Sequence, residues 1–271
     1  MAERPVAATL LALDVGNTSV AAALFDAVAL AASPVAAPLA TFHRVRGTSD
    51  AADGDAELRP IAAEVARLAP AAVVIGAVHR FGAALAERLR NEAPHRPLTL
   101  FDRGADFPLA RDLLDAASVG VDRLAAARAA FALAGGAALV VNAGTALTVD
   151  WIDGAGVFRG GAIVPGRALQ ARALRLFTDR LPEVAPWSAA TPLPLPGRDS
   201  EQAIRHGLDV GVPGMVEALL SALARAAGGE PARFVSGGDA KWLSARLAAP
   251  LRREPFLVAR GLGLAALGSR R

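Results

Sequence analysis

Two stretches of this sequence follow one plan, and that repetition constrains the fold more than any other feature. Residues 10–26 combine an apolar run, a polar glycine turn at 16–18 and a second apolar run, a pattern typical of two tightly joined strands. Residues 139–153 repeat the plan around a second turn at 142–145. Either hairpin alone is an ordinary Gly/Asn turn. The matched pair predicts a duplicated domain with a ligand held between its halves.

The first turn has the composition of an anion site. Gly16 allows the backbone to approach a ligand, and successive amides in such a turn can point at one phosphate. Asp14, at the end of the first strand, is placed to hold a cation or a water molecule bound to one. Asn142 stands at the matching position of the second copy. Together the two turns favour a nucleotide as the ligand.

Composition indicates a globular α/β protein. The chain has 271 residues, of which 53% are hydrophobic, and apolar strands alternate with Ala/Leu/Arg helices, which predicts mixed sheets flanked by helices. The polar segment 102–117 is expected to contain a boundary between domains 1–117 and 118–271. Cysteine is absent, which excludes a disulfide framework and Cys-ligated zinc, and the four histidines lack metal-ligand spacing.

The charge pattern does not point to nucleic acid. The formal net charge is +3, Lys241 is the only lysine, and the arginines are scattered without interleaved aromatics. A solvated Arg-rich surface is therefore favoured over a nucleic-acid partner. Continuous apolar runs fall short of the ~20 residues of a membrane span, and the first run is better used as a strand than as a signal peptide. We expect a cytoplasmic protein with no membrane or nucleic-acid partner.

The segment Gly120-Val121-Asp122-Arg123 opens a predicted helix over 121–134, for which Ser118 is a candidate N-cap. An Asp in the first turn of a helix commonly serves the helix dipole, and the arginine could equally pair with a nearby surface acid, at position 115. The adjacent acid and arginine also supply a base for a hydroxyl and a cation for an anionic substrate, which phosphoryl transfer to an alcohol requires.

Five ordered motifs resemble the type III pantothenate kinase family: Asp14-Val15-Gly16-Asn17-Thr18, Gly120-Val-Asp-Arg, Asn142-Ala-Gly-Thr-Ala, Gly160-Gly161-Ala-Ile-Val-Pro-Gly166 and Gly237-Gly238-Asp239. The resemblance runs from Leu10 to about Gly263 and rests on order and spacing, because each motif alone is weak. It implies the actin-like fold of sugar kinases and Hsp70, in which two related ribonuclease H-like domains hold ATP in the cleft between them. The implied activity is ATP-dependent phosphorylation of pantothenate, the first step of coenzyme A synthesis, by a homodimer.

The resemblance also implies roles for individual residues. Those implied to bind ATP are Asp14, Val15, Gly16, Asn17, Thr18, Gly144, Thr145, Gly237 and Gly238, and Asp14 would hold Mg²⁺ through bound water. Those implied to bind pantothenate are Gly120, Val121, Arg123 and Ser200, and Asp122 would be the catalytic base.

Three departures from the family pattern carry expectations of their own. Asn142 replaces an Asp that the family uses at a K⁺ or NH₄⁺ site, which keeps an oxygen ligand, loses a charge and puts cation dependence in doubt. Ser200 replaces a Thr and keeps its hydroxyl. Leu113 lies near the position of a family Tyr, so an aliphatic pocket wall is expected.

Two other functions compete with pantothenate phosphorylation. A non-catalytic regulatory protein that kept the kinase fold would explain Asn142 and the missing Tyr, but the intact Asp14 and Asp122 argue against it. Another kinase or phosphatase of the superfamily would share the phosphate turns, although such enzymes are usually larger. A substrate panel separates these functions.

Overall fold

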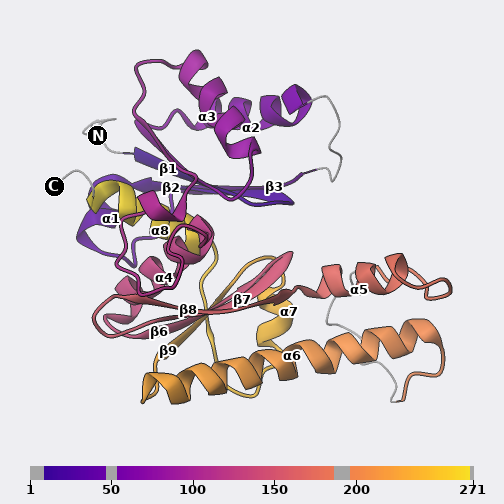
Figure 1. Cartoon of the computed structure of the whole chain (residues 1–271). Helices are drawn as coiled ribbons and strands as arrows, with labels where there is room; N and C mark the ends of the chain where they lie inside the picture. The colour runs from indigo at the N-terminus through magenta and orange to yellow at the C-terminus, as the bar shows by residue number, and fades with distance from the viewer. Residues whose placement is uncertain (1–8, 47–53, 186–195, 269–271) are drawn as a thin grey trace.

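The computed structural model describes residues 9–46, 54–185 and 196–268 and contains two five-stranded sheets (Figure 1). The first sheet consists of β1 (Thr9–Val15), β2 (Ser19–Asp26), β3 (Ala40–Val45), β4 (Ala72–Ala77) and β5 (Leu98–Phe101). The second consists of β6 (Ala138–Ala143), β7 (Ala146–Ile152), β8 (Phe158–Pro165), β9 (Ala232–Ser236) and β10 (Arg252–Arg253).

The two sheets have the same topology. Their strand orders are β3-β2-β1-β4-β5 and β8-β7-β6-β9-β10. In each, the first strand pairs antiparallel with the second and the second with the third, while the fourth and fifth strands run parallel to the first. Asp14 of β1 lies opposite Ala21, and Asn142 of β6 lies opposite Thr148. The expected duplicated α/β fold with mixed sheets is confirmed.

Helices cover both sheets and fill the space between them. They are α1 (Ala27–Ala32), α2 (Gly54–Leu68), α3 (Phe81–Glu92), η1 (Gly104–Asp106), α4 (Val121–Ala134), α5 (Arg167–Leu176), α6 (Ser200–Ala227), α7 (Ala240–Ser244) and α8 (Leu257–Gly268). Helix α4 packs on β6 and β7, and α8, although last in the chain, packs on β1 and β4 of the first sheet. These two helices pack against each other between the sheets (Figure 1).

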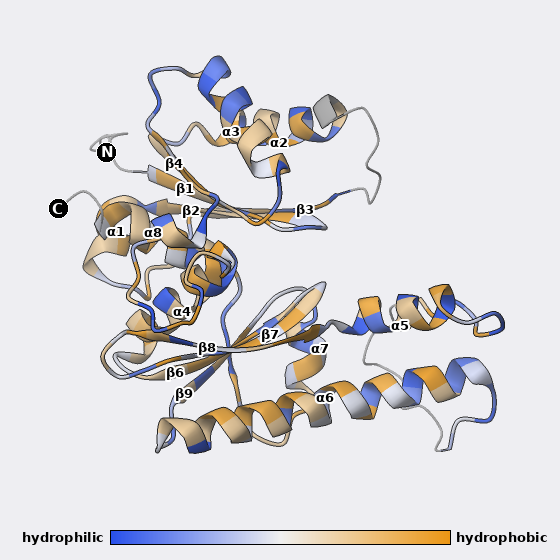
Figure 2. Ribbon diagram, in the orientation of Figure 1, coloured by the Kyte–Doolittle hydropathy of each residue, from blue (hydrophilic) through white to orange (hydrophobic). Residues whose placement is uncertain are grey.

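Strand β1 separates two hydrophobic cores, because alternate side chains of a strand point to opposite faces. Leu11, Leu13 and Val15 pack with α2 and α3, whose outward sides are hydrophilic (Figure 2). Leu10 and Ala12 pack with α4 and α8 on the other face. The central strand is therefore buried on both sides, and its end is held rigidly.

Three local expectations differ from the structure. Ser118 does not cap α4: the N-cap is Gly120, and the Ser118 hydroxyl donates to the Asp115 carbonyl at 3.1 Å. The Ala/Pro-rich composition of residues 28–38 predicts a loop, but residues 27–32 form α1, because the Asp26 carboxylate accepts from the amides of residues 28 and 29. The glycines and proline of residues 211–214 predict an interruption, but helix α6 is continuous through them. Pro213 is buried there together with Val212, and this packing outweighs the lost hydrogen bond.

Helix α6 also bears on the expected absence of membrane spans. By length and hydropathy alone it could cross a membrane, although its sequence contains no continuous apolar run of that length. Apart from Pro213, its buried residues recur every four positions, and they pack on the second sheet: Ile204, Leu208, Val212, Val216, Leu220 and Ala224. One face of α6 is thus a core face, which is the pattern of a helix in a globular fold.

Candidate active site between the two sheets

The two glycine turns meet between the sheets. The β1–β2 turn carries Thr18 and the β6–β7 turn carries Thr145, and their Oγ1 atoms lie 2.7 Å apart, within hydrogen-bond distance. These residues are separated by 127 positions in the chain, so the contact depends on how the two halves are packed. The two turns that the sequence analysis identified are therefore in contact in the structure.

Glycines from neighbouring loops support the second turn. The Gly166 amide donates to the Thr145 carbonyl at 2.9 Å, and a Cβ at Gly166 would lie only 2.0 Å from the Gly144 carbonyl oxygen. Gly237 has φ +98°, and a Cβ there would lie 2.4 Å from the carbonyl oxygen of Ala143. At both positions the loop lies so close to the turn that only glycine, which has no side chain, fits.

Two carboxylates lie beside the turns. Asp14 is half-buried at the end of β1, where burial and the nearby charge of Asp122 raise its pKa to about 7. Burial also raises the pKa of Asp122, in the first turn of α4. A divalent cation bound near these two carboxylates would stabilise their ionised forms.

The residues present fit Mg²⁺ rather than a metal held entirely by protein ligands. Within the described ranges no group of three or more His, Cys, Asp or Glu side chains converges on one point. Mg²⁺ needs only one or two carboxylates when water and phosphate oxygens complete its shell. Asp14, with its raised pKa near the end of β1, is the carboxylate that suits this arrangement.

Arg123 has a carboxylate partner that the sequence did not identify. Its Nε atom lies 3.0 Å and 3.2 Å from the two carboxylate oxygens of Asp150 on β7. Asp150 is buried, which raises its pKa, while the guanidinium of Arg123 opposes that rise. The surface partner considered from sequence, Asp115, instead accepts the Ala117 amide. A lone acid in the apolar run of β7 was the available signal for Asp150.

The other predicted residues occupy different settings. Val121 is buried, and Asn142 is half-buried in register with Thr148 and Ser236. Leu113 is half-buried near Gly160. Ser200 is exposed at the first residue of α6. There, α5 and the first half of α6 form an arm that projects beyond the second sheet, away from α4 (Figure 1).

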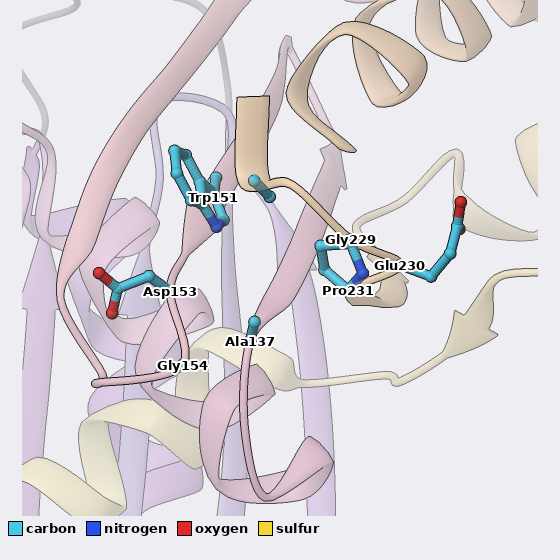
Figure 3. Close-up of a pocket in the computed structure, with 8 residues that line it drawn as sticks. Ala137, Trp151, Asp153, Gly154, Gly229, Glu230 and Pro231 are labelled. Carbon is cyan, nitrogen blue, oxygen red and sulfur yellow. The ribbon is translucent and has the colours of Figure 1, made fainter. Parts of the chain in front are cut away.

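A separate hollow lies at the opposite end of the second sheet. It has a volume of about 250 Å³ and is lined by Ala137, Trp151, Asp153, Gly154, Ala227, Gly229, Glu230 and Pro231 (Figure 3). It borders the start of β6, whereas the Gly144-Thr145 turn follows the end of that strand. The hollow is therefore distinct from the site between the sheets.

Comparison with known proteins identifies the relatives of this chain. Residues 10–222 match the family model described as type III pantothenate kinase. A type III pantothenate kinase of Alkalilimnicola ehrlichii is 36% identical over 260 residues, which cover 93% of this chain and 95% of that protein. Another, of Rhodopirellula baltica, is 44% identical over 149 residues, or 53% of each chain.

Solved structures with the same fold are more distant in sequence. A Baf family transcriptional activator from Campylobacter jejuni superposes with a TM-score of 0.58 at 18% identity, over 97% of this chain and 98% of that one. A ROK family glucokinase from Streptomyces griseus, in complex with glucose and AMPPNP, gives 0.51 at 15% identity, over 97% and 100%. At such identities the likeness shows the fold alone.

Proposed function

The chain belongs to the type III pantothenate kinase family, and we propose that the residues between its two sheets carry out the family's reaction. That reaction is the ATP-dependent phosphorylation of pantothenate to 4'-phosphopantothenate in coenzyme A biosynthesis. The observation that carries the assignment of the site is the 2.7 Å contact between Thr18 and Thr145, with Asp14 and Asp122 beside it. Phosphate turns and carboxylates converge there, as phosphoryl transfer requires.

In this proposal Asp122 accepts the proton of the pantothenate hydroxyl. Burial raises the pKa of Asp122, which brings a carboxylate closer to the basicity at which proton transfer near neutral pH is efficient. Its place in the first turn of α4 holds it against a rigid helix. Because the transition state is loose, orienting the hydroxyl is as much its task as taking the proton.

ATP would lie along the two turns. The proposed contacts are Asp14, Val15, Gly16, Asn17 and Thr18 from the first sheet, Gly144 and Thr145 from the second, and Gly237 and Gly238 towards the adenosine. Asp14 would hold Mg²⁺ through water. When bound, this ion neutralises charge on the triphosphate.

Pantothenate would bind at the start of α4. Gly120 and Val121 offer backbone groups, and Arg123 would meet the carboxylate of the substrate. Its bonds to Asp150 use Nε and Nη2, so we assign the remaining nitrogen, Nη1, to pantothenate. The Asp150 pair would then fix the guanidinium before substrate arrives.

A homodimer is part of the proposal. Ser200 is proposed to reach substrate, yet α6 begins on the projecting arm rather than beside α4 in the same chain. The arm also exposes large apolar side chains, which commonly mark contact surfaces: Leu169, Leu176, Phe177 and Val210. Sedimentation at micromolar concentration tests the dimer, and a purely monomeric species would contradict it.

The remaining proposals concern organisation and conditions. We assign residues 1–117 and 118–271 to two domains, with α8 crossing back to the first sheet. We place the protein in the cytoplasm, without nucleic-acid or membrane partners. Asn142 is proposed as a weakened ligand for K⁺ or NH₄⁺, which predicts less activation by either ion than an Asn142→Asp variant shows.

The direct test is ADP release from ATP with pantothenate as acceptor, with and without K⁺ or NH₄⁺. We expect ADP release that depends on pantothenate. Glucose-dependent ATP use, or phosphate release without any acceptor, would indicate another enzyme of the superfamily. Absence of turnover with every acceptor would indicate a regulatory protein.

The role of Asp122 has a test of its own. Asp122→Asn is expected to lower kcat by at least about 100-fold, the scale of general-base catalysis, while ATP binding is retained. Asp115→Asn is the matched control, because Asp115 is an exposed acid on the segment leading into α4. A near-normal kcat in Asp122→Asn would show that another group accepts the proton.

A further inference from the structure

Arg46, just after β3, lies against the backbone of the first turn. Its Nη1 atom donates to the carbonyl of Gly16 at 3.1 Å and to that of Asn17 at 3.2 Å. Its own backbone amide donates to the carbonyl of Thr18 at 2.7 Å. One residue therefore contacts three consecutive carbonyls of the turn, from a position about thirty residues later in the chain.

These contacts set the direction of the turn's amides. In a trans peptide the carbonyl and the N–H of the following residue point in opposite directions. The carbonyls of Gly16, Asn17 and Thr18 face Arg46, so the N–H groups of Asn17, Thr18 and Ser19 point away from it. Successive amides aimed to one side form an anion-binding concavity.

Three neighbours hold the guanidinium in place. Glu57 of α2 pairs with Nε at 3.5 Å, and the ring of Phe81 lies under the guanidinium carbon at 4.0 Å. His79 Nδ1 lies 3.5 Å from Nη1. The Arg46 side chain is only 9% exposed, so its charge is poorly screened by solvent. A fixed cation behind a set of amides strengthens their attraction for phosphate.

We propose that Arg46 is a positioning residue for ATP, which orients the amides of the first turn towards the triphosphate and adds a buried positive charge behind them. It acts through the backbone of residues 16–18 and does not itself contact the nucleotide. The inference rests on the proposed ATP site and adds to it a residue that none of the five sequence motifs contains.

Calorimetric titration of the full chain tests the proposal, with a non-hydrolysable ATP analogue plus Mg²⁺ as one ligand and adenosine as the other. Arg46→Met is expected to raise Kd for the analogue by about 10–100-fold, the scale of losing charge-assisted hydrogen bonds. The Kd values for adenosine and pantothenate should change by less than about twofold, because neither ligand carries phosphate. In steady-state assays KM for ATP should rise while KM for pantothenate stays constant.

Two further variants separate positioning from general stability. Arg46→Lys keeps the charge but lacks the planar fork, so its Kd for the analogue should fall between wild type and Arg46→Met. Arg44→Met is the matched control, because Arg44 is exposed on β3 two residues earlier, and its Kd should equal wild type. Should Arg46→Met not fold, Arg46→Lys decides, and it is expected to raise Kd for the analogue above the wild-type value.

Specific results would overturn the proposal. Wild-type affinity for the analogue in folded Arg46→Met would overturn it, as would an equal loss of adenosine affinity. If Arg46→Met does not fold, unchanged affinity for the analogue in Arg46→Lys has the same meaning. Failure of the wild-type protein to bind the analogue would instead overturn the proposed ATP site itself.

Discussion

The two glycine turns have the same strand topology around them but are supported in different ways. Arg46 bonds directly to carbonyls of the first turn, through its side chain. The second turn is held by main chain: the amides of Gly166 and Asp239 donate to the carbonyls of Thr145 and Ala143, at 2.9 Å and 3.0 Å. The side-chain contacts to the first turn can be removed by substituting Arg46. The main-chain contacts to the second turn can be disturbed only by a substitution that pushes the neighbouring loops away from it.

Both turns nevertheless have a buried arginine stacked on an aromatic ring. Arg46 lies 4.0 Å from the ring centre of Phe81, and Arg167 lies 4.3 Å from that of Trp242. Arg167 bonds to the Asp239 carboxylate at 2.7 Å, so it acts on a supporting loop and not on the turn. Each half therefore has an arginine–aromatic pair, but only in the first half does the arginine bond to the turn itself.

The largest expected effect concerns the strand residue that precedes each turn, which is Asp14 in β1 and Asn142 in β6. Asp14→Asn gives both turns an amide and is expected to lower turnover by at least about 100-fold, since the proposed Mg²⁺ contact is lost. Wild-type turnover in Asp14→Asn would show that the Asp14 carboxylate is not needed for the reaction.

In the absence of Mg²⁺, Asp14→Asn should be more stable to unfolding than wild type, and the difference should depend on pH. The pKa of Asp14 is about 7 in the folded chain against an ordinary 3.8, so the folded state binds an extra proton between these values. Stability due to Asp14 therefore falls as pH rises through this window and stays low above about pH 7. Calorimetry should show a higher Tm for Asp14→Asn, by about 2–4 °C per kcal/mol removed, and the gain should grow from about pH 4 to about pH 7.

A smaller effect is expected from a methyl group placed behind the second turn. Gly166→Ala brings a Cβ to 2.0 Å from the Gly144 carbonyl oxygen, so the turn must move. A displacement near 1 Å costs on the order of 100-fold in turnover at worst, and we expect about 10–100-fold in kcat/KM for ATP. Gly154→Ala is the control, since a Cβ there has open space. Equal kinetics of the two variants would mean that main-chain contact does not set the second turn.

The smallest expected effect comes from the contact that the two turns share. Thr18→Val and Thr145→Val each remove one hydroxyl of the 2.7 Å pair, worth about 0.5–1.5 kcal/mol, or about 2–10-fold in KM for ATP. The double variant should lose less than the product of the single losses, because the hydroxyls act together. If the rise in KM of the double variant equals the product of the two single rises, each threonine acts independently of the other.

Much of the fold could be predicted because it depends on local patterns. Apolar runs and turn residues located both hairpins, and helix 121–134 was predicted with the ends it has, stopped by Gly135 in the left-handed conformation. The matched hairpins also predicted the duplication. Helix α6 was misjudged at 211–214, because glycine and proline weaken a helix locally while burial of one face sustains it.

Parts of the site could be predicted for the same reason. Asp14, the glycine turns and Asp122 stand in short motifs whose chemistry is readable from neighbouring residues. Arg46 could not be found this way, because nothing near it in the chain indicates its partners. Asp150 stands out as a lone acid in an apolar strand, but its neighbours in the chain do not indicate that it pairs with Arg123.

The sequence by itself determined two similar halves, each with a polar turn at the end of an apolar strand, since turn chemistry and strand periodicity act over a few residues. Only the tertiary structure decided that Thr18 meets Thr145, that Arg123 pairs with Asp150 and that α8 returns to the first sheet. Those contacts join residues far apart in the chain. They arise from the packing of whole faces, to which every buried side chain contributes and which no short motif specifies.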